Sequence, residues 1–326
     1  MTTQPHIGVI GCGHWGKNLI RNFSELSALL AICDNNPETA AKFAADYNVS
    51  ALGFEEVLRH PDIRGVVLAS PAPFHFSMAK AALEAGKDVF VEKPICLDDT
   101  EAAQLCEIAD KSGNILMVGH LLHYHPVFMK LKQLVKSGAL GRLRYIYSNR
   151  LSLGKIRREE NVLWSFAPHD VSMILGLADE GLPSYINASG SCQTHPAIED
   201  FATLEMRFAS GAAAHITVSW LNPFKEQKLI VIGDQGMSIF DDQADWPQKL
   251  MHYPHIVDFS GQSPDIQKSD GIAIDVAYSE PLRNECQHFI DCIQSREKPR
   301  TDGYEGLNVL KVLIRADQAI QQKKAA

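Results

Sequence analysis

The chain has 326 residues, of which 45% are hydrophobic and 21% charged, and its formal net charge is −8. This length allows two domains with sizeable cores, and the composition is that of an ordinary globular protein. The acidic balance excludes a global basic footprint for nucleic acid, and no apolar run approaches the roughly 18 residues that a membrane span needs.

The first third of the chain alternates short apolar runs with helical stretches. Strands are predicted at residues 6–10, 29–33, 65–69, 88–92 and 115–118. Helices are predicted between them, at 16–24, 37–47, 55–58, 74–85 and 100–112. Because these strands are apolar throughout, helices are expected to cover both faces of their sheet. The rhythm predicts an α/β Rossmann domain, with a doubly wound parallel sheet, over residues 1–121.

The remaining residues, 122–326, follow a different rhythm and predict a C-terminal α+β domain. Strands are expected at 142–150, 185–193, 200–208, 212–219 and 228–233, with helices at 126–137, 167–177, 280–295 and 303–325. Consecutive strands without crossover helices predict a large, mostly antiparallel open sheet. One face of such a sheet is available to another subunit, so we expect a homo-oligomer.

A glycine-rich segment, Gly11-Cys12-Gly13-His14-Trp15-Gly16, lies between the first predicted strand and the first predicted helix. A dinucleotide-binding G-x-G-x-x-G motif requires this position. Gly11 permits the tight turn, Gly13 lets the pyrophosphate approach the backbone, and Gly16 permits close packing of helix and strand. Free N–H groups at the helix N-terminus would bind the phosphates. We expect the whole loop, including His14 and Trp15, to bind the cofactor.

Asp34 closes the second predicted strand. A carboxylate at this place accepts hydrogen bonds from the adenosine ribose and repels a 2′-phosphate, and the following Asn35 and Asn36 supply no arginine to neutralise one. The predicted cofactor is therefore NAD rather than NADP. Capping of the next helix is the alternative role of Asp34.

The segment Ser70-Pro71-Ala72-Pro73-Phe74-His75 follows the third predicted strand. A rigid turn at the carboxyl edge of the sheet lies where ligands bind in such folds, so we expect Ser70, Pro71 and His75 on the nicotinamide side. For His75, a simple place at the start of the next helix is an equal alternative.

Glu92-Lys93-Pro94 ends the fourth predicted strand at the same edge. A lysine there is unusual, because helices cover both sheet faces and its ammonium must reach the cleft. Pro94 is expected to fix the turn, with a cis peptide bond as one option. Together with the glycine loop and the strand ending in Asp34, this E-K-P segment resembles the Gfo/Idh/MocA oxidoreductases over essentially the whole chain. The resemblance implies that Glu92 and Lys93 lie in the cofactor site and that Lys93 is catalytic.

Residues 154–170, GKIRREENVLWSFAPHD, resemble the UDP-N-acetylglucosaminuronate 3-dehydrogenase branch of that family. The branch oxidises the sugar C3 hydroxyl to a ketone, ahead of transamination toward diamino sugar acids of surface polysaccharides such as the lipopolysaccharide O-antigen. His169 matches the family's active-site histidine. Many relatives have an aspartate four residues earlier, where this chain has Ser165, and this departure argues against a polyol-dehydrogenase Asp–His pair. The resemblance also implies a homotetramer and, in some relatives, recycling of NADH on the enzyme with 2-oxoglutarate.

Lys93 and His169 suit the oxidation of a secondary alcohol, which needs removal of the hydroxyl proton and stabilisation of the developing alkoxide. A neutral imidazole can take the proton, and a lysine ammonium near the same oxygen can stabilise the charge. We expect His169 to be the base and Lys93 its electrostatic partner, although the reverse assignment is also chemically reasonable.

Four basic residues upstream of His169 form a cluster in an otherwise acidic chain: Arg150, Lys155, Arg157 and Arg158. Because arginine binds diphosphate and carboxylate groups in bidentate form, the cluster fits a UDP-sugar acid. A solvated charged loop is the equal alternative for each of these residues. Tyr124, Asn161 and Ser165 complete the expected substrate side, with Asn161 as a partner for sugar hydroxyls or the N-acetyl group.

Three histidines, His120, His123 and His125, could suggest a metal, but no cysteine or carboxylate lies at ligand spacing beside them, so no metal is predicted. The seven cysteines have no C-x-x-C spacing and are expected to be small buried hydrophobes. The polar start of the chain shows no signal-peptide pattern, so we expect a cytoplasmic protein without a membrane partner.

Two alternative functions are compatible with these residues. The nearer one is an NAD(P)-dependent dehydrogenase of another sugar or polyol in the same family, against which Ser165 and the basic cluster argue. The other belongs to a different class, a non-catalytic NAD-binding sensor, which would need neither Lys93 nor His169.

Overall fold

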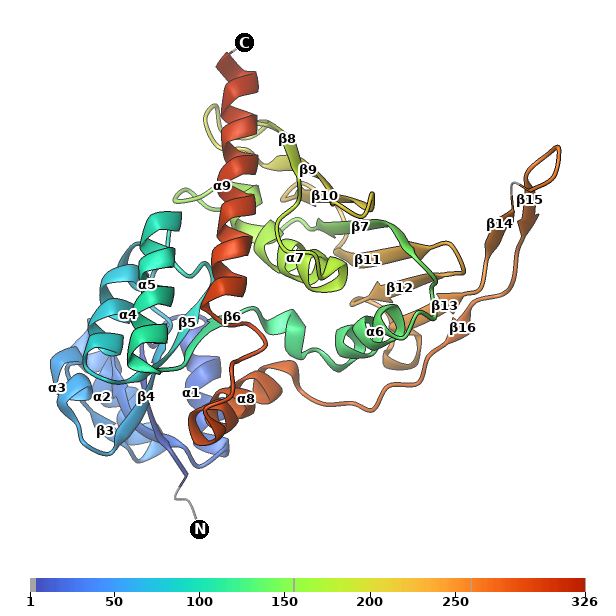
Figure 1. The fold of residues 1–326 in the computed structure, drawn as a ribbon. Helices are drawn as coiled ribbons and strands as arrows, with labels where there is room; N and C mark the ends of the chain where they lie inside the picture. Colours follow the sequence, from blue (N-terminus) through green and yellow to red (C-terminus); the bar gives the residue numbers. More distant parts are fainter. Residues whose placement is uncertain (1–3, 155, 259, 326) are drawn as a thin grey trace. The chain divides into compact units, whose positions relative to one another are not determined.

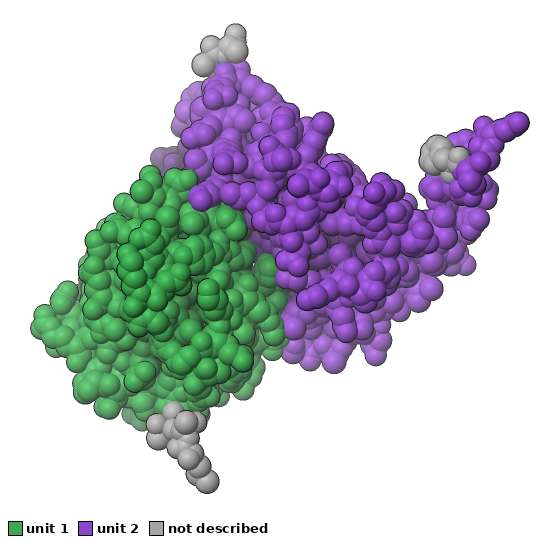
Figure 2. Space-filling view, in the orientation of Figure 1, with its two compact units in different colours: residues 1–124, 280–310 green, residues 125–279, 311–326 purple. Residues whose placement is uncertain are grey.

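The computed structural model describes residues 4–154, 156–258 and 260–325, which divide into two compact units (Figure 2). The first unit comprises Met1–Tyr124 and Glu280–Leu310, and the second comprises His125–Ser279 and Lys311–Ala326. The expected boundary after residue 121 therefore lies close to the observed one. The expectation that everything after it belongs to the second domain is wrong, because residues 280–310 return to the first unit.

A parallel sheet forms the centre of the first unit. Its strand order is β3-β2-β1-β4-β5-β6, and every pair is parallel. The strands are β1 (His6–Ile10), β2 (Leu29–Cys33), β3 (Ser50–Ala51), β4 (Ile63–Leu68), β5 (Asp88–Glu92) and β6 (Leu116–Gly119). The strand order reverses between β1 and β4, and ligands of doubly wound sheets bind at the carboxyl ends of strands at this point. The predicted Rossmann fold is confirmed.

Helices flank this sheet, and two of them, α2 and α5, begin at a side-chain cap. Asn36 caps α2 and Asp98 caps α5, each by accepting hydrogen bonds from two backbone N–H groups of the first turn. The helices are α1 (Gly16–Glu25), α2 (Pro37–Tyr47), α3 (Phe54–Arg59), α4 (His75–Glu84) and α5 (Asp99–Ser112), with short 3-10 turns η1 (Ala72–Phe74) and η2 (Leu121–Tyr124).

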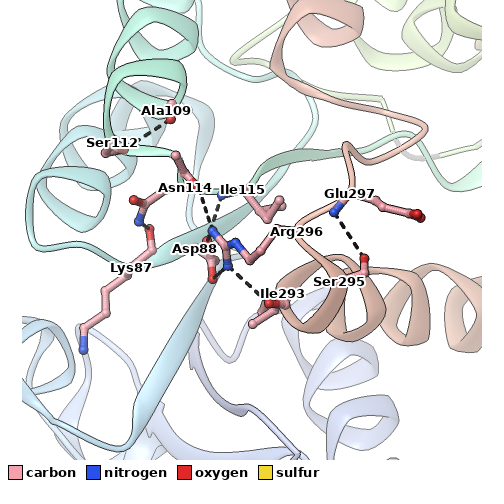
Figure 3. A network of polar contacts seen from close by, with 11 residues as sticks. Lys87, Asp88, Ala109, Ser112, Asn114, Ile115, Ile293, Ser295, Arg296 and Glu297 are labelled. Atoms are coloured by element: carbon pink, nitrogen blue, oxygen red, sulfur yellow. Dashed lines mark hydrogen bonds and ion pairs between the residues drawn. The ribbon is translucent and has the colours of Figure 1, made fainter. Parts of the chain in front are cut away.

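Helix α8 (Pro281–Ser295) belongs to the first unit because it buries its apolar face there. Phe289 makes edge-to-face ring contacts with Phe23 of α1 and with Phe90 of β5. Arg296, which follows α8, forms two hydrogen bonds of 2.8 Å to the Asp88 carboxylate (Figure 3). Asp88 is only 2% exposed and also accepts a bond from Ile115 N, so these contacts fix the end of α8 to the start of β5. Helix α9 (Gly303–Ala325) begins in this unit.

An eight-stranded sheet forms the centre of the second unit, in the order β16-β13-β12-β11-β7-β10-β9-β8. Only the β7–β10 pair is parallel, which confirms the mostly antiparallel sheet. Its strands are β7 (Leu143–Leu151), β8 (Tyr185–Ser191), β9 (Phe201–Arg207), β10 (Ala213–Ser219), β11 (Glu226–Gly233), β12 (Met237–Asp241), β13 (Leu250–Tyr253) and β16 (Ile272–Ala273). The sequence did not predict β12, β13 or β16. A small hairpin, β14 (Ile256–Asp258) and β15 (Asp265–Gln267), extends from the sheet (Figure 1).

Two helices of the second unit, α6 (Pro126–Lys136) and α7 (Val162–Ala178), accompany this sheet, and η3 (Trp246–Gln248) is a short turn. Helix α7 packs on β7, β9 and β10. It begins five residues before the expected start at 167, because Asn161 caps it and the helix continues through Pro168. Twelve of the 17 residues of α7 are buried, and this packing outweighs the hydrogen bond that a proline removes.

All seven cysteines are unpaired thiols. Among the described residues, no helix is long and apolar enough to cross a membrane.

Candidate active site

The glycine loop joins β1 to α1 at the point where the strand order reverses. Gly11 has a φ of +98°, and a Cβ there would lie 2.8 Å from the carbonyl oxygen of Ala69, after β4. A Cβ on Gly16 would lie 1.9 Å from the Gly11 oxygen, so the fold itself requires both glycines. A Cβ on Gly13 would meet no described atom within 4 Å. The missing side chain at Gly13 therefore leaves room for a pyrophosphate beside the N-terminus of α1.

Asp34 ties the end of β2 to this loop. Its carboxylate accepts hydrogen bonds from Cys12 N at 2.7 Å and from Asn36 N at 2.9 Å. The side-chain cap of α2 is Asn36, so the capping role considered for Asp34 falls to its neighbour. Asp34 remains partly exposed, as a group that contacts a ribose must be.

His75 connects two turns at the carboxyl edge of the sheet. Its ring nitrogens lie 2.7 Å from the carbonyl oxygens of Ser70 and Pro94, and the residue is 1% exposed. Burial lowers the pKa of His75. Because both nitrogens are engaged by the backbone, the expected direct contact of His75 with the cofactor is corrected to a supporting role at the start of α4.

Ser70 and Pro71 keep the place that the sequence predicted for them, directly after β4. The Ser70 Oγ is buried and has no hydrogen-bond partner among the described residues. Pro71 is exposed. A buried hydroxyl of this kind fits a polar group of a bound dinucleotide.

Glu92 and Lys93 lie at the carboxyl end of β5, and the Lys93–Pro94 peptide bond is cis. The Glu92 carboxylate accepts a bond of 2.5 Å from the Trp15 indole of the glycine loop and one of 3.3 Å from Lys93 N. Removal from water raises the pKa of Glu92 to about 7, against the opposing effects of Trp15 and Lys93. Trp15 therefore joins the phosphate-binding loop to the strand end that carries Lys93, while His14 is exposed in the loop.

His169 belongs to the second unit, where it lies within α7 and is partly buried. The next residue, Asp170, is 1% exposed and accepts bonds from Ser148 Oγ at 2.6 Å and Arg150 Nε at 2.6 Å, both on β7. These contacts fix the helix turn that carries His169 to the sheet. Ser165, one turn earlier, is buried.

Two residues expected to bind substrate have structural roles instead. Arg150 is engaged by Asp170, and its side chain is only 11% exposed. Asn161 caps α7 through its oxygen, and its amide nitrogen donates to Glu199 and Asp317 at 3.1 Å each. Both N–H groups of the Asn161 amide and one acceptor position of its oxygen are therefore used by the fold.

Two further basic residues of the cluster, Arg157 and Arg158, lie on the loop before α7. Arg157 forms ion pairs with Glu159 and Glu160 of the same loop, and Arg158 is exposed. Lys155 lies outside the described residues. Arg157 and Arg158 therefore remain the described candidates for an anionic substrate.

Tyr124 was expected to face the substrate and is instead part of the core of the first unit. It is 0% exposed, belongs to the same buried cluster as Leu282 and Phe289 of α8, and its hydroxyl is 3.0 Å from Thr301 Oγ1. The assignment of Tyr124 to the substrate side is wrong, because α8 and the segment after it return to cover this residue.

The sequence did not predict a group of polar side chains that follows β6, formed by His120, His123 and Glu305. The Glu92 carboxylate lies over Gly119, where a Cβ would be 3.0 Å from its oxygens. The following residue, His120, has its Nδ1 2.5 Å from Glu305 Oε2 of α9, and His123 lies 3.9 Å from the other oxygen. His120 and Glu305 are 185 positions apart, so no local pattern could pair them. Among the described residues, no group of histidine, cysteine and carboxylate side chains could hold a metal ion.

Comparison with known proteins identifies the family. Residues 6–120 match a family model described as the oxidoreductase family with an NAD-binding Rossmann fold, and residues 128–239 match the GFO/IDH/MocA C-terminal domain. The chain belongs to the Gfo/Idh/MocA oxidoreductases. Its cofactor is NAD, for which Gly13, Asp34 and the Ser70 hydroxyl provide a fitting site.

Individual relatives narrow the class of reaction. The chain is 28% identical over 316 residues to a UDP-N-acetylglucosamine 3-dehydrogenase of Acidithiobacillus ferrooxidans, covering 96% of each chain. A solved structure of that enzyme matches with a TM-score of 0.85 at 25% identity over 97% of this chain and 98% of the other. The scyllo-inositol 2-dehydrogenase (NAD(+)) of Bacillus subtilis is 25% identical over 349 residues, covering 98% and 95%. The protein is thus an NAD-dependent oxidoreductase that acts on a CH–OH group of a sugar or polyol.

Proposed function

We propose that this enzyme oxidises the C3 hydroxyl of UDP-N-acetyl-glucosaminuronic acid to the 3-keto sugar, in the synthesis of diamino sugars for surface polysaccharides such as the O-antigen of lipopolysaccharide. The observation that carries the reaction class is Lys93 at the carboxyl end of β5, next to the glycine loop through Glu92 and Trp15. The similarity to a nucleotide-sugar 3-dehydrogenase over 96% of both chains supports the substrate class.

Lys93 and His169 are the proposed catalytic residues. When NAD is bound, it supplies the hydride acceptor. One of the two side chains takes the hydroxyl proton, and the other stabilises the oxygen as negative charge develops on it. Asp170, held by Ser148 and Arg150, orients the helix turn that carries His169.

The carboxylate of the sugar acid is assigned to Arg157, Arg158 and Lys155. UDP-N-acetylglucosamine, which lacks the sugar carboxylate, is a second candidate substrate, because the Acidithiobacillus relative is named for it and because Arg150 already pairs with Asp170. Ser165 in the interior of α7 supports a nucleotide sugar over a polyol, since polyol dehydrogenases of the family often have an aspartate there.

A near-ultraviolet absorbance assay for NADH separates these substrates. The purified protein is given NAD with the UDP-sugar acid, with UDP-N-acetylglucosamine or with scyllo-inositol, each with and without 2-oxoglutarate. Formation of NADH with the acid in the absence of 2-oxoglutarate supports the proposal. A 3-keto product that mass spectrometry detects only when 2-oxoglutarate is present also supports it. Turnover of UDP-N-acetylglucosamine but not of the acid would support the second candidate, and turnover of scyllo-inositol only would contradict both.

We also propose a homotetramer located in the cytoplasm. Three aromatic side chains on one face of the eight-stranded sheet, Tyr145, Tyr185 and Phe201, are exposed in the single chain. A second copy that packs on this sheet would cover them. Light scattering at several protein concentrations tests the assembly, and a monomer at all concentrations would contradict it.

A further inference from the structure

We propose that Trp15 is a positioning residue for Lys93 and acts through the hydrogen bond from its indole to the Glu92 carboxylate. The inference rests on the proposed function, because it needs Lys93 to act on the substrate. It deepens that function by giving a residue of the glycine loop a part in the chemical step. Trp15, Glu92 and Lys93 all lie in the first unit.

Core packing does not account for a tryptophan at position 15. The residue is 37% exposed, and its only polar side-chain atom, Nε1, donates a bond of 2.5 Å to Glu92 Oε1. A bond from an N–H group to an ionised carboxylate is stronger than a bond between neutral groups. Phenylalanine would present a similar aromatic surface without this bond. The indole N–H group is therefore the feature that gives tryptophan a specific role here.

Trp15 also begins the helix whose N-terminus is expected to bind the pyrophosphate. It is the N-cap residue of α1, and its carbonyl oxygen accepts a bond of 2.8 Å from Asn18 N. One residue thus contacts both the first turn of α1, through its backbone, and the end of β5, through its side chain. The indole bond connects the backbone that binds phosphate to the strand end that carries Lys93.

The Glu92 carboxylate is held on several sides. Its Oε1 accepts the indole bond, and its Oε2 accepts a bond of 3.3 Å from Lys93 N. Glu92 pairs with Gly119 of β6, where a Cβ would lie 3.0 Å from both carboxylate oxygens. The glycine therefore leaves the space that the carboxylate occupies. Because Lys93 is the next residue in the chain, a fixed Glu92 also fixes the backbone from which the lysine side chain starts.

A separate contact holds the residue after Lys93. His75 Nδ1 lies 2.7 Å from the carbonyl oxygen of Pro94, and His75 Nε2 lies 2.7 Å from that of Ser70. The backbone on each side of Lys93 is thus tied to a turn of the cofactor site. Because His75 holds Pro94 without Trp15, loss of the indole bond is expected to displace Lys93 without unfolding this segment.

A displaced Lys93 is expected to affect the chemical step more than the binding of NAD. Misplacement of a catalytic group by about 1 Å can slow a reaction about 10²-fold. The phosphate contacts of the glycine loop come from backbone N–H groups, which a side-chain substitution at Trp15 retains. The inference therefore predicts a loss of rate without a matching loss of NAD affinity.

Trp15→Phe tests this in the full-length protein, with Trp246→Phe as the matched control. Trp246 of the second unit also donates its indole N–H group, to Val276 O at 2.7 Å. Trp15→Phe is expected to lower the single-turnover rate of NADH formation between about 10-fold and 10²-fold, and to leave the Kd of NAD within about threefold. The control should leave both values within about threefold. An unchanged rate for Trp15→Phe, or a weaker NAD affinity with an unchanged rate, would overturn the positioning role.

A double-mutant cycle separates positioning from general damage to the fold. Glu92→Ala removes the acceptor, so Trp15→Phe has no indole bond to lose in that background and is expected to change the rate by less than about twofold. Trp246→Phe is expected to have the same effect in both backgrounds. Losses from Trp15→Phe and Glu92→Ala that simply multiply would show that the two residues act independently, and would overturn the inference.

The assay uses whichever alcohol the wild-type enzyme oxidises, so failure of the proposed substrate is seen separately, in the wild type. Lys93→Met is measured in parallel. A large loss of rate for Lys93→Met with none for Trp15→Phe would overturn the positioning role alone. No loss for Lys93→Met would contradict the proposed function, and the inference with it.

Discussion

Lys93 is the single residue on which the proposed chemistry depends most. We expect Lys93→Met to lower kcat by about 10²–10⁴-fold, because the methionine can neither exchange a proton nor stabilise an alkoxide. The NAD affinity, measured by fluorescence titration, should stay within about threefold of the wild-type value. The lysine is expected to act on the reacting alcohol rather than on the adenosine half of NAD. The control Lys111→Met replaces an exposed lysine of α5. Equal turnover of Lys93→Met and the control would refute the catalytic assignment.

We expect Asp34 to determine which dinucleotide is preferred. Asp34→Asn keeps an oxygen for the Cys12 N–H group but removes the charge that repels a 2′-phosphate. We expect NAD binding to weaken about tenfold, which corresponds to about 1.4 kcal/mol, and NADP binding to strengthen. Isothermal titration of both dinucleotides checks this, with the exposed Asp46→Asn as control. Unaltered discrimination would show that Asp34 does not contact the ribose.

The places of the glycine loop and of Lys93 in the fold could be predicted because they depend on neighbours in the sequence. Gly11, Gly13 and Gly16 lie in one loop, and Lys93 directly follows a strand. His75, Arg150 and Tyr124 were misassigned for the opposite reason. Their partners Pro94, Asp170 and Thr301 lie 19, 20 and 177 positions away, and no local pattern shows that these side chains are already occupied.

At the scale of elements, the first strands were predictable because each is a continuous apolar run between helices. The unit to which α8 belongs could not be predicted in the same way. Its amphipathic pattern identifies a helix but not the sheet that it covers, and the contacts that decide this join Phe289 to Phe90 and Arg296 to Asp88. Strands β12 and β13 were missed because they are short and lie in a segment with mixed polarity.

The Arg296–Asp88 ion pair provides a test of how α8 is held. Arg296→Ala would leave the Asp88 carboxylate buried without its charged partner, and we expect a loss of about 2 kcal/mol in the free energy of unfolding. The arginine side chain is 41% exposed, which keeps the expected loss below that of a fully buried pair. Arg283→Ala, which removes an exposed pair of α8 with Glu25, should cost less than about 0.5 kcal/mol. Urea denaturation compares the two, and equal losses would contradict this account.

At the scale of the whole molecule, Glu285 makes the stability depend on pH. The carboxyl is 0% exposed, and neither oxygen has a hydrogen-bond partner among the described residues. The pKa of Glu285 in the folded protein is raised well above the usual value of 4.5. Its protonation therefore stabilises the folded state fully below pH 4.5, and this stabilisation is lost as the pH rises toward the pKa of the folded protein. Across that window the loss is at most about 1.4 kcal/mol per pH unit.

Glu285→Met is therefore expected to increase the free energy of unfolding at mildly alkaline pH, with a smaller difference at acidic pH. Thermal and urea unfolding at several pH values measure this, and Glu84→Met, at an exposed position of α4, is the control. A variant that is less stable than the wild type at alkaline pH would show that the Glu285 carboxyl stabilises the native state.

The most direct test of the central claim is the fate of the hydrogen on C3. UDP-N-acetyl-glucosaminuronic acid with deuterium at C3 is incubated with the enzyme and NAD, and the reduced dinucleotide is analysed by mass spectrometry. The account predicts that the reduced dinucleotide carries one deuterium and that the sugar becomes the 3-keto product. Unlabelled reduced dinucleotide formed together with an oxidised sugar that retains its deuterium would contradict it, because oxidation would then occur at another carbon.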